Sequence, residues 1–235
     1  MTICIAAIYG AGDGVVLISD RMVTAHFPIG YEFEHAENTK ISTINVDDDN
    51  SFYALMAGDV LCGNEILNYA KNECEQRELI SAYEFVEIIR SAYQTVRLNS
   101  IIRTELEPRG LDLETYYSTQ QRLAPNIIHM IDRSMKTTDL AVEIIIAGKV
   151  KEKFNVFTVH NPGVIRENTS VGYSTIGSGA PHAIYSLIEA GYSTSMKKED
   201  VIELVKKAKE RSQVAPGVGI ATNLVVTPTE DTENA

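Results

Sequence analysis

The sequence predicts an α+β protein in which helices cover the outer faces of packed sheets. Strand-like and helical runs are segregated along the chain instead of alternating one by one, which is typical of α+β folds. The first strand-like runs are apolar at nearly every position, so both faces of their sheet need a cover. The chain has 235 residues, of which 44% are hydrophobic and 23% are charged, and this balance suits one globular domain.

Two strand pairs are predicted near the start of the chain. Residues 2–9 and 15–20 are rich in aliphatic and β-branched side chains, and the Gly- and Asp-rich turn 10–14 separates them, which predicts a hairpin. A similar pattern over 40–44 and 51–57 predicts a second pair of strands.

Helical spacing then replaces the strand pattern. Apolar residues recur three and four positions apart over 63–74 and again over 82–99. A third segment, about 112–135, shows the same spacing, and Pro125 is expected to break or kink it because proline disrupts a helix interior.

Strands return in the second half of the chain, followed by two helices and a last strand. The predicted elements are strands over 141–147 and 154–159, a helix from Pro181 to about Gly191, a helix over 198–212 and a strand over 222–227. The polar and acidic residues 228–235 are expected to form a disordered tail.

Composition and charge exclude several classes of protein. Acidic residues outnumber basic ones by 32 to 21, and the resulting net charge of −11 argues against nucleic acid as a partner. No run approaches the roughly 18 apolar residues that a membrane helix needs. The start of the chain lacks a basic leader and a long apolar stretch, so we expect no signal peptide and a cytoplasmic location.

The cysteines and histidines do not predict a metal site. Cys4, Cys62 and Cys74 are odd in number, and neither they nor the five histidines have the spacing of metal ligands. We therefore expect reduced thiols and no bound metal.

Thr2 stands at the head of the first predicted strand and could act as a nucleophile. If Met1 is removed, Thr2 carries a free α-amino group with a pKa of about 7.7–8.0, so the amine can accept a proton near neutral pH. A hydroxyl is a weak nucleophile until a base takes its proton, and a threonine paired with its own N-terminal amine is one known solution.

Several segments resemble proteasome β-type subunits, in the same order and with similar spacing from residue 2 to about residue 227. Besides the strand led by Thr2, they are Val15 to Thr24, Asn38-Thr39-Lys40-Ile41, Ala57-Gly58-Asp59, Ile146-Ala147-Gly148 and Ile176-Gly177-Ser178-Gly179-Ala180-Pro181. The resemblance implies the N-terminal nucleophile (Ntn) hydrolase fold, a four-layer αββα sandwich of two mostly antiparallel sheets between helical layers. It also implies assembly of identical chains into a ring or barrel.

The resemblance also implies a role for each matched residue. Thr2 would be the nucleophile, and Asp20 and Lys40 would form a charged pair beneath it. The Lys40 ammonium would disfavour a second positive charge on the terminal amine, while Asp20 would hold Lys40 through a charge-assisted hydrogen bond. Ser178 would lie near the amine. A backbone N–H of the segment 55–58 would stabilise the oxyanion, and the sequence leaves the choice within this segment open.

Each of these residues also has a purely structural interpretation. Asp20 can end a strand, Lys40 can be a solvated lysine at a sheet edge, and Ser178 can serve the turn formed by Gly-Ser-Gly. Cys4 is a rival nucleophile on the same strand face as Thr2, although its apolar neighbours favour a buried small side chain. The catalytic interpretation is preferred because the four residues all fall where one active site needs them.

Three features depart from the family pattern. Ser212 and Ala215 stand where the resemblance places an Asp and a Ser that support the terminal amine, so an altered site is expected. The stretch of about 101–135 is longer than the usual connection, which implies a helical insertion within a single domain 1–227. No propeptide precedes Thr2, so loss of Met1 is the only processing expected.

The sequence therefore predicts a threonine-type hydrolase that cleaves an amide, in the first place a peptide bond, through an acyl-enzyme and without a cofactor. The alternatives are a non-catalytic self-assembling subunit of the proteasome α type, a hydrolase of small amides, and a peptide ligase. The expected partners are a peptide or protein substrate and further copies of the chain, and they do not include nucleic acid or a membrane. The sequence leaves open whether an ATP-dependent unfoldase delivers the substrate.

Overall fold

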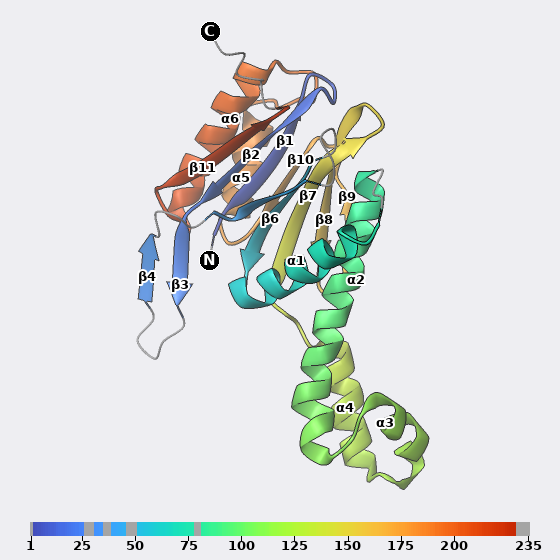
Figure 1. Ribbon diagram of the computed structural model, residues 1–235. Coiled ribbons are helices and arrows are strands. Elements are labelled where there is room, and N and C mark those ends of the chain that lie inside the picture. The colour runs from blue at the N-terminus through green and yellow to red at the C-terminus, as the bar shows by residue number, and fades with distance from the viewer. Residues whose placement is uncertain (1, 26–30, 35–38, 46–50, 78–80, 229–235) are drawn as a thin grey trace.

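Two antiparallel sheets packed face to face form the centre of the molecule (Figure 1). The computed structural model describes residues 2–25, 31–34, 39–45, 51–77 and 81–228. The first sheet has the order β10-β1-β2-β11 and the second has the order β5-β6-β7-β8-β9, while β3 pairs with β4. The strands are β1 Cys4–Tyr9, β2 Gly14–Asp20, β3 Met22–Ala25, β4 Tyr31–Glu34, β5 Ile41–Asn45, β6 Ser51–Gly58, β7 Val142–Val150, β8 Lys153–His160, β9 Val164–Glu167, β10 Tyr173–Ile176 and β11 Thr222–Thr227.

The packing on both faces of the first sheet explains why β1 is apolar throughout. Successive side chains of a strand point to opposite faces of the sheet. The even-numbered residues of β1 lie in the core between the sheets, together with Leu55 and Ile145 of the second sheet. The odd-numbered residues belong to the core shared with α5 (Ala180–Glu189) and α6 (Lys198–Arg211). The predicted cover on both faces is confirmed.

Helices α1 (Val60–Cys74) and α2 (Ala82–Ile101) cover the outer face of the second sheet. Asp59 caps the first turn of α1 with its carboxylate. Phe52 of β6 stacks on Phe85 of α2, with ring centroids 4.8 Å apart. The layers therefore follow the order helix, sheet, sheet, helix, and the predicted four-layer sandwich is confirmed.

A helical projection leaves the sandwich at the end of α2 (Figure 1). Leu106, Tyr116 and Ile131 form a small core of its own. Pro125 occupies the first turn of a second helix instead of kinking one long helix, so the predicted segment 112–135 is two helices. The projection comprises a π-helix Ile102–Leu106, a 3₁₀ helix Glu107–Arg109, α3 Leu113–Thr119, a 3₁₀ helix Gln120–Arg122 and α4 Pro125–Thr137.

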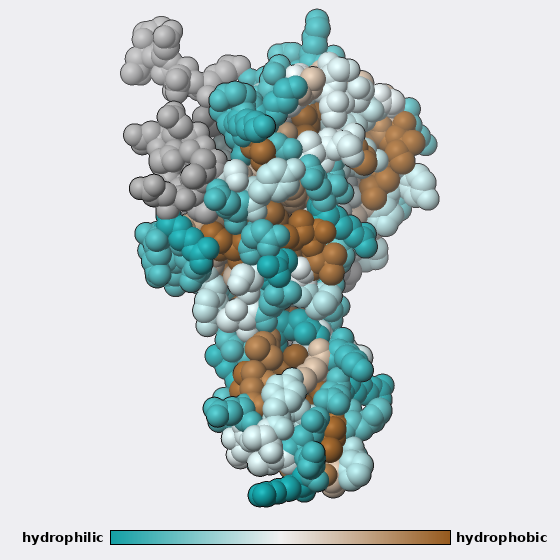
Figure 2. All heavy atoms as spheres, turned by 90° about the vertical axis from the view of Figure 1, so that its right-hand side faces the viewer, coloured by the Kyte–Doolittle hydropathy of each residue, from teal (hydrophilic) through white to brown (hydrophobic). Residues whose placement is uncertain are grey.

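Apolar patches lie over both the sandwich and the projection in Figure 2, with hydrophilic surface between them. None of the helices among the described residues has the length and apolar character that crossing a bilayer requires. The predicted tail 228–235 falls outside the described residues except for Pro228.

Four short strands are missing from the sequence prediction: β3, β4, β9 and β10. Each has only four residues, which is too short to show a clear two-residue period. The strand β10 is also polar at two of its four positions, and it is held by pairing with β1 from far along the chain. Its existence depends on tertiary contact more than on local propensity.

The core between the sheets should dominate the stability of the sandwich. Ile145 is fully buried there, so Ile145→Ala is expected to lower the free energy of unfolding by about 2–5 kcal/mol through lost burial and a residual cavity. The matched control is Ile188→Ala on the exposed face of α5, for which a change within about 0.5 kcal/mol is expected. Urea unfolding followed by circular dichroism measures both, and equal effects would contradict the assignment of this core.

Candidate active site

The ends of three strands bring Thr2, Asp20 and Lys40 together. Thr2 directly precedes β1, and Asp20 ends β2, whose antiparallel pairing with β1 places it opposite Ile3. The N–H of Asp20 donates to the carbonyl of Ile3 at 3.2 Å. Lys40 directly precedes β5 of the second sheet, and its carbonyl accepts the N–H of Met56. The three residues therefore meet where one end of the first sheet faces the second.

The three side chains form one buried hydrogen-bonded group. The Lys40 ammonium donates to the Thr2 hydroxyl oxygen and also to Asp20 Oδ1 at 2.7 Å. The Thr2 hydroxyl in turn donates to Asp20 Oδ1. Thr2 is 2% exposed, Asp20 is fully buried and Lys40 is 8% exposed. The Lys40 ammonium thus lies within hydrogen-bonding distance of the Thr2 hydroxyl, as expected. Because Lys40 is buried, it is not a solvated lysine at a sheet edge.

Asp20 is held as a carboxylate by several donors. Besides Lys40 and Thr2, its oxygens accept backbone N–H groups of Ile3 at 3.0 Å, Met22 at 3.1 Å and Gly219 at 3.0 Å. Burial alone would raise the pKa of the Asp20 carboxyl, but the Lys40 charge and the hydrogen bonds outweigh burial and hold this pKa below its usual value. Asp20 is therefore ionised, and its hydrogen bonds hold it in place.

Ser178 lies in a turn that contacts Thr2 from the other side. Its hydroxyl accepts the Thr2 N–H at 3.3 Å and lies 3.4 Å from the Thr2 carbonyl oxygen. The N–H of Gly179 donates to the same carbonyl at 3.1 Å. Gly177 has a φ of +92°, and a Cβ there would come within 2.4 Å of the Thr2 carbonyl oxygen, so only glycine fits. All four predicted site residues are therefore brought together.

Cys4 is close to this group but is closed to solvent. Its side chain is fully buried, and its thiol donates to the carbonyl of Met56 at 3.4 Å. Burial raises the pKa of the Cys4 thiol to about 12, so it remains protonated. The structure favours the core interpretation of Cys4 over the rival nucleophile.

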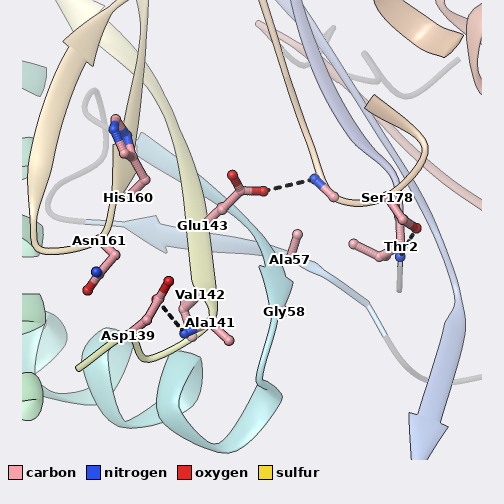
Figure 3. Close-up of a pocket in the computed structure, with 11 residues that line it drawn as sticks. Thr2, Ala57, Gly58, Asp139, Ala141, Val142, Glu143, His160, Asn161 and Ser178 are labelled. Atoms are coloured by element: carbon pink, nitrogen blue, oxygen red, sulfur yellow. Dashed lines mark hydrogen bonds between the residues drawn. The ribbon is translucent and has the colours of Figure 1, made fainter. Parts of the chain in front are cut away.

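A pocket of about 550 Å³ opens on Thr2 and Ser178 (Figure 3). Asp20 and Lys40 are not among its lining residues and support Thr2 from behind. The remaining lining residues are Ala57, Gly58, Asp139, Ala141, Val142, Glu143, His160, Asn161 and Gly177. Sequence reasoning missed the four polar side chains in this set. The one available signal was Glu143, the single charged residue in the apolar run 141–147.

The strand register leaves Gly58 as the residue of the segment 55–58 whose N–H can face the pocket. The N–H of Met56 bonds to Lys40, so the N–H groups of β6 alternate between β5 and β7 from that point. Ala57 pairs with Glu143 of β7. The N–H of Gly58 is directed toward the β5 side, beyond the residue where β5 begins, and Gly58 lines the pocket beside Thr2.

Ser212 supplies no carboxylate to the site. It is fully buried, and its hydroxyl donates to the carbonyl of Ala208 in its own helix at 2.8 Å. A Cβ on Gly179 would lie 2.9 Å from the Ser212 Cβ, so the two backbones pack closely. Ala215, which stands where the family pattern has a Ser, is likewise buried and apolar.

The fold and the threonine at the head of its first strand define an Ntn hydrolase-like protein. A family model described as proteasome subunit matches residues 91–212, which is half of the chain, and the chain belongs to the proteasome subunit family. No curated protein matches it in a sequence comparison.

Several solved structures share the fold of this chain. An Anbu (Gly-1) mutant from Hyphomicrobium sp. strain MC1 has a TM-score of 0.68 and 13% identity, covering 96% of this chain and 81% of that chain. The helical assembly of the Anbu complex from Pseudomonas aeruginosa has a TM-score of 0.66 and 12% identity, covering 95% and 80%. HslV from Trypanosoma brucei has a TM-score of 0.55 and 17% identity, covering 95% and 98%. At these identities, the likeness is one of fold.

The lowered pKa of Asp20 predicts a specific dependence of stability on pH. The stabilisation from ionised Asp20 is fully present above the pKa of an unfolded Asp, about 3.9, and is lost as the pH falls through the lower folded pKa. We expect Asp20→Asn to be less stable than the wild type at pH 7 and to lose less of its remaining stability between pH 5 and the acid limit. Urea unfolding at stepped pH measures this, and parallel acid profiles would contradict it.

Proposed function

We propose that the chain is a threonine-type Ntn hydrolase that cleaves peptide or amide bonds through an acyl-enzyme. The observation that carries this proposal is the convergence of Lys40 and Asp20 on the Thr2 hydroxyl in a buried site that opens into a pocket. The pocket beside Thr2 provides the space that the carbonyl group of an incoming substrate needs.

The proposal requires that the residue before Thr2 is removed. The Thr2 nitrogen then becomes an α-amine, which is the base that takes the hydroxyl proton. The neighbouring Lys40 ammonium disfavours a second positive charge, so it keeps this amine neutral and able to accept a proton. Ser178 orients the amine through the contact that it already makes with the Thr2 nitrogen.

The reaction then proceeds in two stages. Thr2 Oγ1 attacks the carbonyl carbon of the substrate, the amine takes its proton, and the oxyanion that forms is stabilised by the N–H of Gly58. The intermediate collapses to an ester as the amine returns the proton to the leaving nitrogen. Water activated by the same amine hydrolyses the ester. If a second amine attacked the ester instead, the product would be a new amide, which is the ligase variant of this chemistry.

A non-catalytic assembly role is the second candidate. It is favoured by one observation, the replacement of two supporting polar residues of the family by Ser212, which bonds to its own helix, and Ala215. The two candidates differ in the chemistry of Thr2, whereas the fold is common to both.

Covalent labelling of Thr2 distinguishes these candidates. We expect an electrophile that reacts with N-terminal threonine to form an adduct at Thr2, located by peptide mass spectrometry. Thr2→Ala should abolish the adduct. Lys40→Met should slow it about 10²–10⁴-fold, because the base loses the charge that keeps it neutral. The exposed Lys206→Met is the matched control and should label like the wild type.

Two results of this experiment would contradict the proposal. They are labelling of Cys4 instead of Thr2, and no labelling in a protein whose intact mass shows that Thr2 is the first residue. Full retention of Met1 in the intact mass would leave only the assembly role. Circular dichroism of Lys40→Met is the control for folding, because an unpaired Asp20 is costly to bury.

We also propose that identical chains assemble. Membership of the proteasome subunit family supports this, as does the likeness to an Anbu complex described as a helical assembly. Light scattering on a size-exclusion column should give a mass several times that of one chain for both the wild type and Thr2→Ala, because assembly does not use the Thr2 hydroxyl. A single-chain mass at all concentrations would refute this proposal and leave the catalytic one standing.

A further inference from the structure

We propose that Glu143 is a positioning residue that holds the turn 177–179 against Thr2. This inference rests on the proposed function, since it concerns the same site. It adds a carboxylate from the second sheet to a site whose predicted members are Thr2, Asp20, Lys40 and Ser178.

Glu143 is an exposed residue near the start of β7, at the edge of the core between the two sheets. It shares a strand face with Ile145 and Ala147, which lie in the core between the two sheets. Its partner across the ladder is Ala57, a small side chain that leaves room above it. The Glu143 carboxylate therefore lies where the core between the sheets opens into the pocket beside Thr2 (Figure 3).

The carboxylate reaches across the pocket to the other sheet. Glu143 Oε2 accepts the N–H of Gly177 at 3.1 Å, and Gly177 directly follows β10 of the first sheet. Figure 3 shows this bond between the strand that carries Glu143 and the turn that carries Ser178. The bond ties the second sheet to the turn that follows β10, so it suits a role in fixing the turn.

The turn 177–179 contacts Thr2 with each of its residues. Gly179 donates to the Thr2 carbonyl, the Ser178 hydroxyl lies 3.3 Å from the Thr2 nitrogen, and Gly177 packs directly on the Thr2 backbone. A shift of the turn therefore moves the Thr2 nitrogen, which is the proposed base. A misplacement of about 1 Å in a reacting group can cost about 10²-fold in rate.

Three variants separate positioning from other roles of this side chain. Glu143→Ala removes the acceptor, and Glu143→Gln keeps an oxygen that can accept the Gly177 N–H. Glu152→Ala removes another exposed carboxylate, in the turn after β7, and is the matched control. The measurement is the rate of Thr2 acylation by the electrophile as a function of its concentration, which gives a maximal rate and an apparent affinity.

We expect Glu143→Ala to lower the maximal acylation rate about 10–10²-fold, with a much smaller change in apparent affinity. Glu143→Gln should recover most of the loss, and Glu152→Ala should match the wild type. Equal losses in Glu143→Ala and Glu143→Gln would overturn the positioning role, as would a loss confined to affinity, which would make Glu143 a substrate contact only.

A second measurement tests the contact without any reaction. Amide hydrogen exchange of the turn 177–179 should be faster in Glu143→Ala than in the wild type, and close to the wild type in Glu143→Gln. Unchanged exchange in Glu143→Ala overturns the inference. If the wild type is not labelled at Thr2, the proposed function fails, whereas a labelled wild type with a fully active Glu143→Ala means that only this inference fails.

Discussion

The ion pair between Lys40 and Asp20 joins the two sheets at the point where the first strand begins. Both side chains are almost completely buried. Breaking a buried pair by removing one partner typically costs about 3–5 kcal/mol, because the other charge is left without compensation. The carboxylate is further satisfied by three backbone N–H groups, so the site combines charge neutrality with nearly complete hydrogen bonding. The Thr2 hydroxyl is placed by this pair.

The sandwich makes such a pair possible. The first sheet contributes the start of β1, the end of β2 and the turn after β10, while the second contributes Lys40 before β5 and the end of β6. Apolar packing between the sheets fixes their separation, and the site lies at one edge of that packing. The pocket is the space left at this edge. Neighbouring parts of one interface therefore bury the ion pair and leave Thr2 accessible from the pocket.

The sequence predicts those parts of the site that depend on local sequence patterns. Thr2, Asp20 and Lys40 stand at the ends of strands with strong apolar patterns, and Ser178 stands in a Gly-Ser-Gly turn before a helix. These positions follow from chain order once the strands are known. The two sheets and their covering helices follow from the same patterns.

The parts that escaped prediction depend on contacts between distant segments. The role proposed for Glu143 depends on its hydrogen bond with Gly177, which is 34 residues away in the turn after β10 of the other sheet. The N–H of Gly219 reaches Asp20 from 199 residues away. The short strand β10 forms because it pairs with β1, which is distant in the sequence. None of these pairings leaves a periodic trace in the sequence.

The division of the site between two sheets makes it depend on the packing of these sheets. Under the proposed function, Thr2 on the first sheet depends on Lys40 from the second sheet. A molecule in which the two sheets are separated would keep its strands but lack the arrangement that activates Thr2. The proposed chemistry therefore requires closure of the sheets as well as formation of the secondary structure.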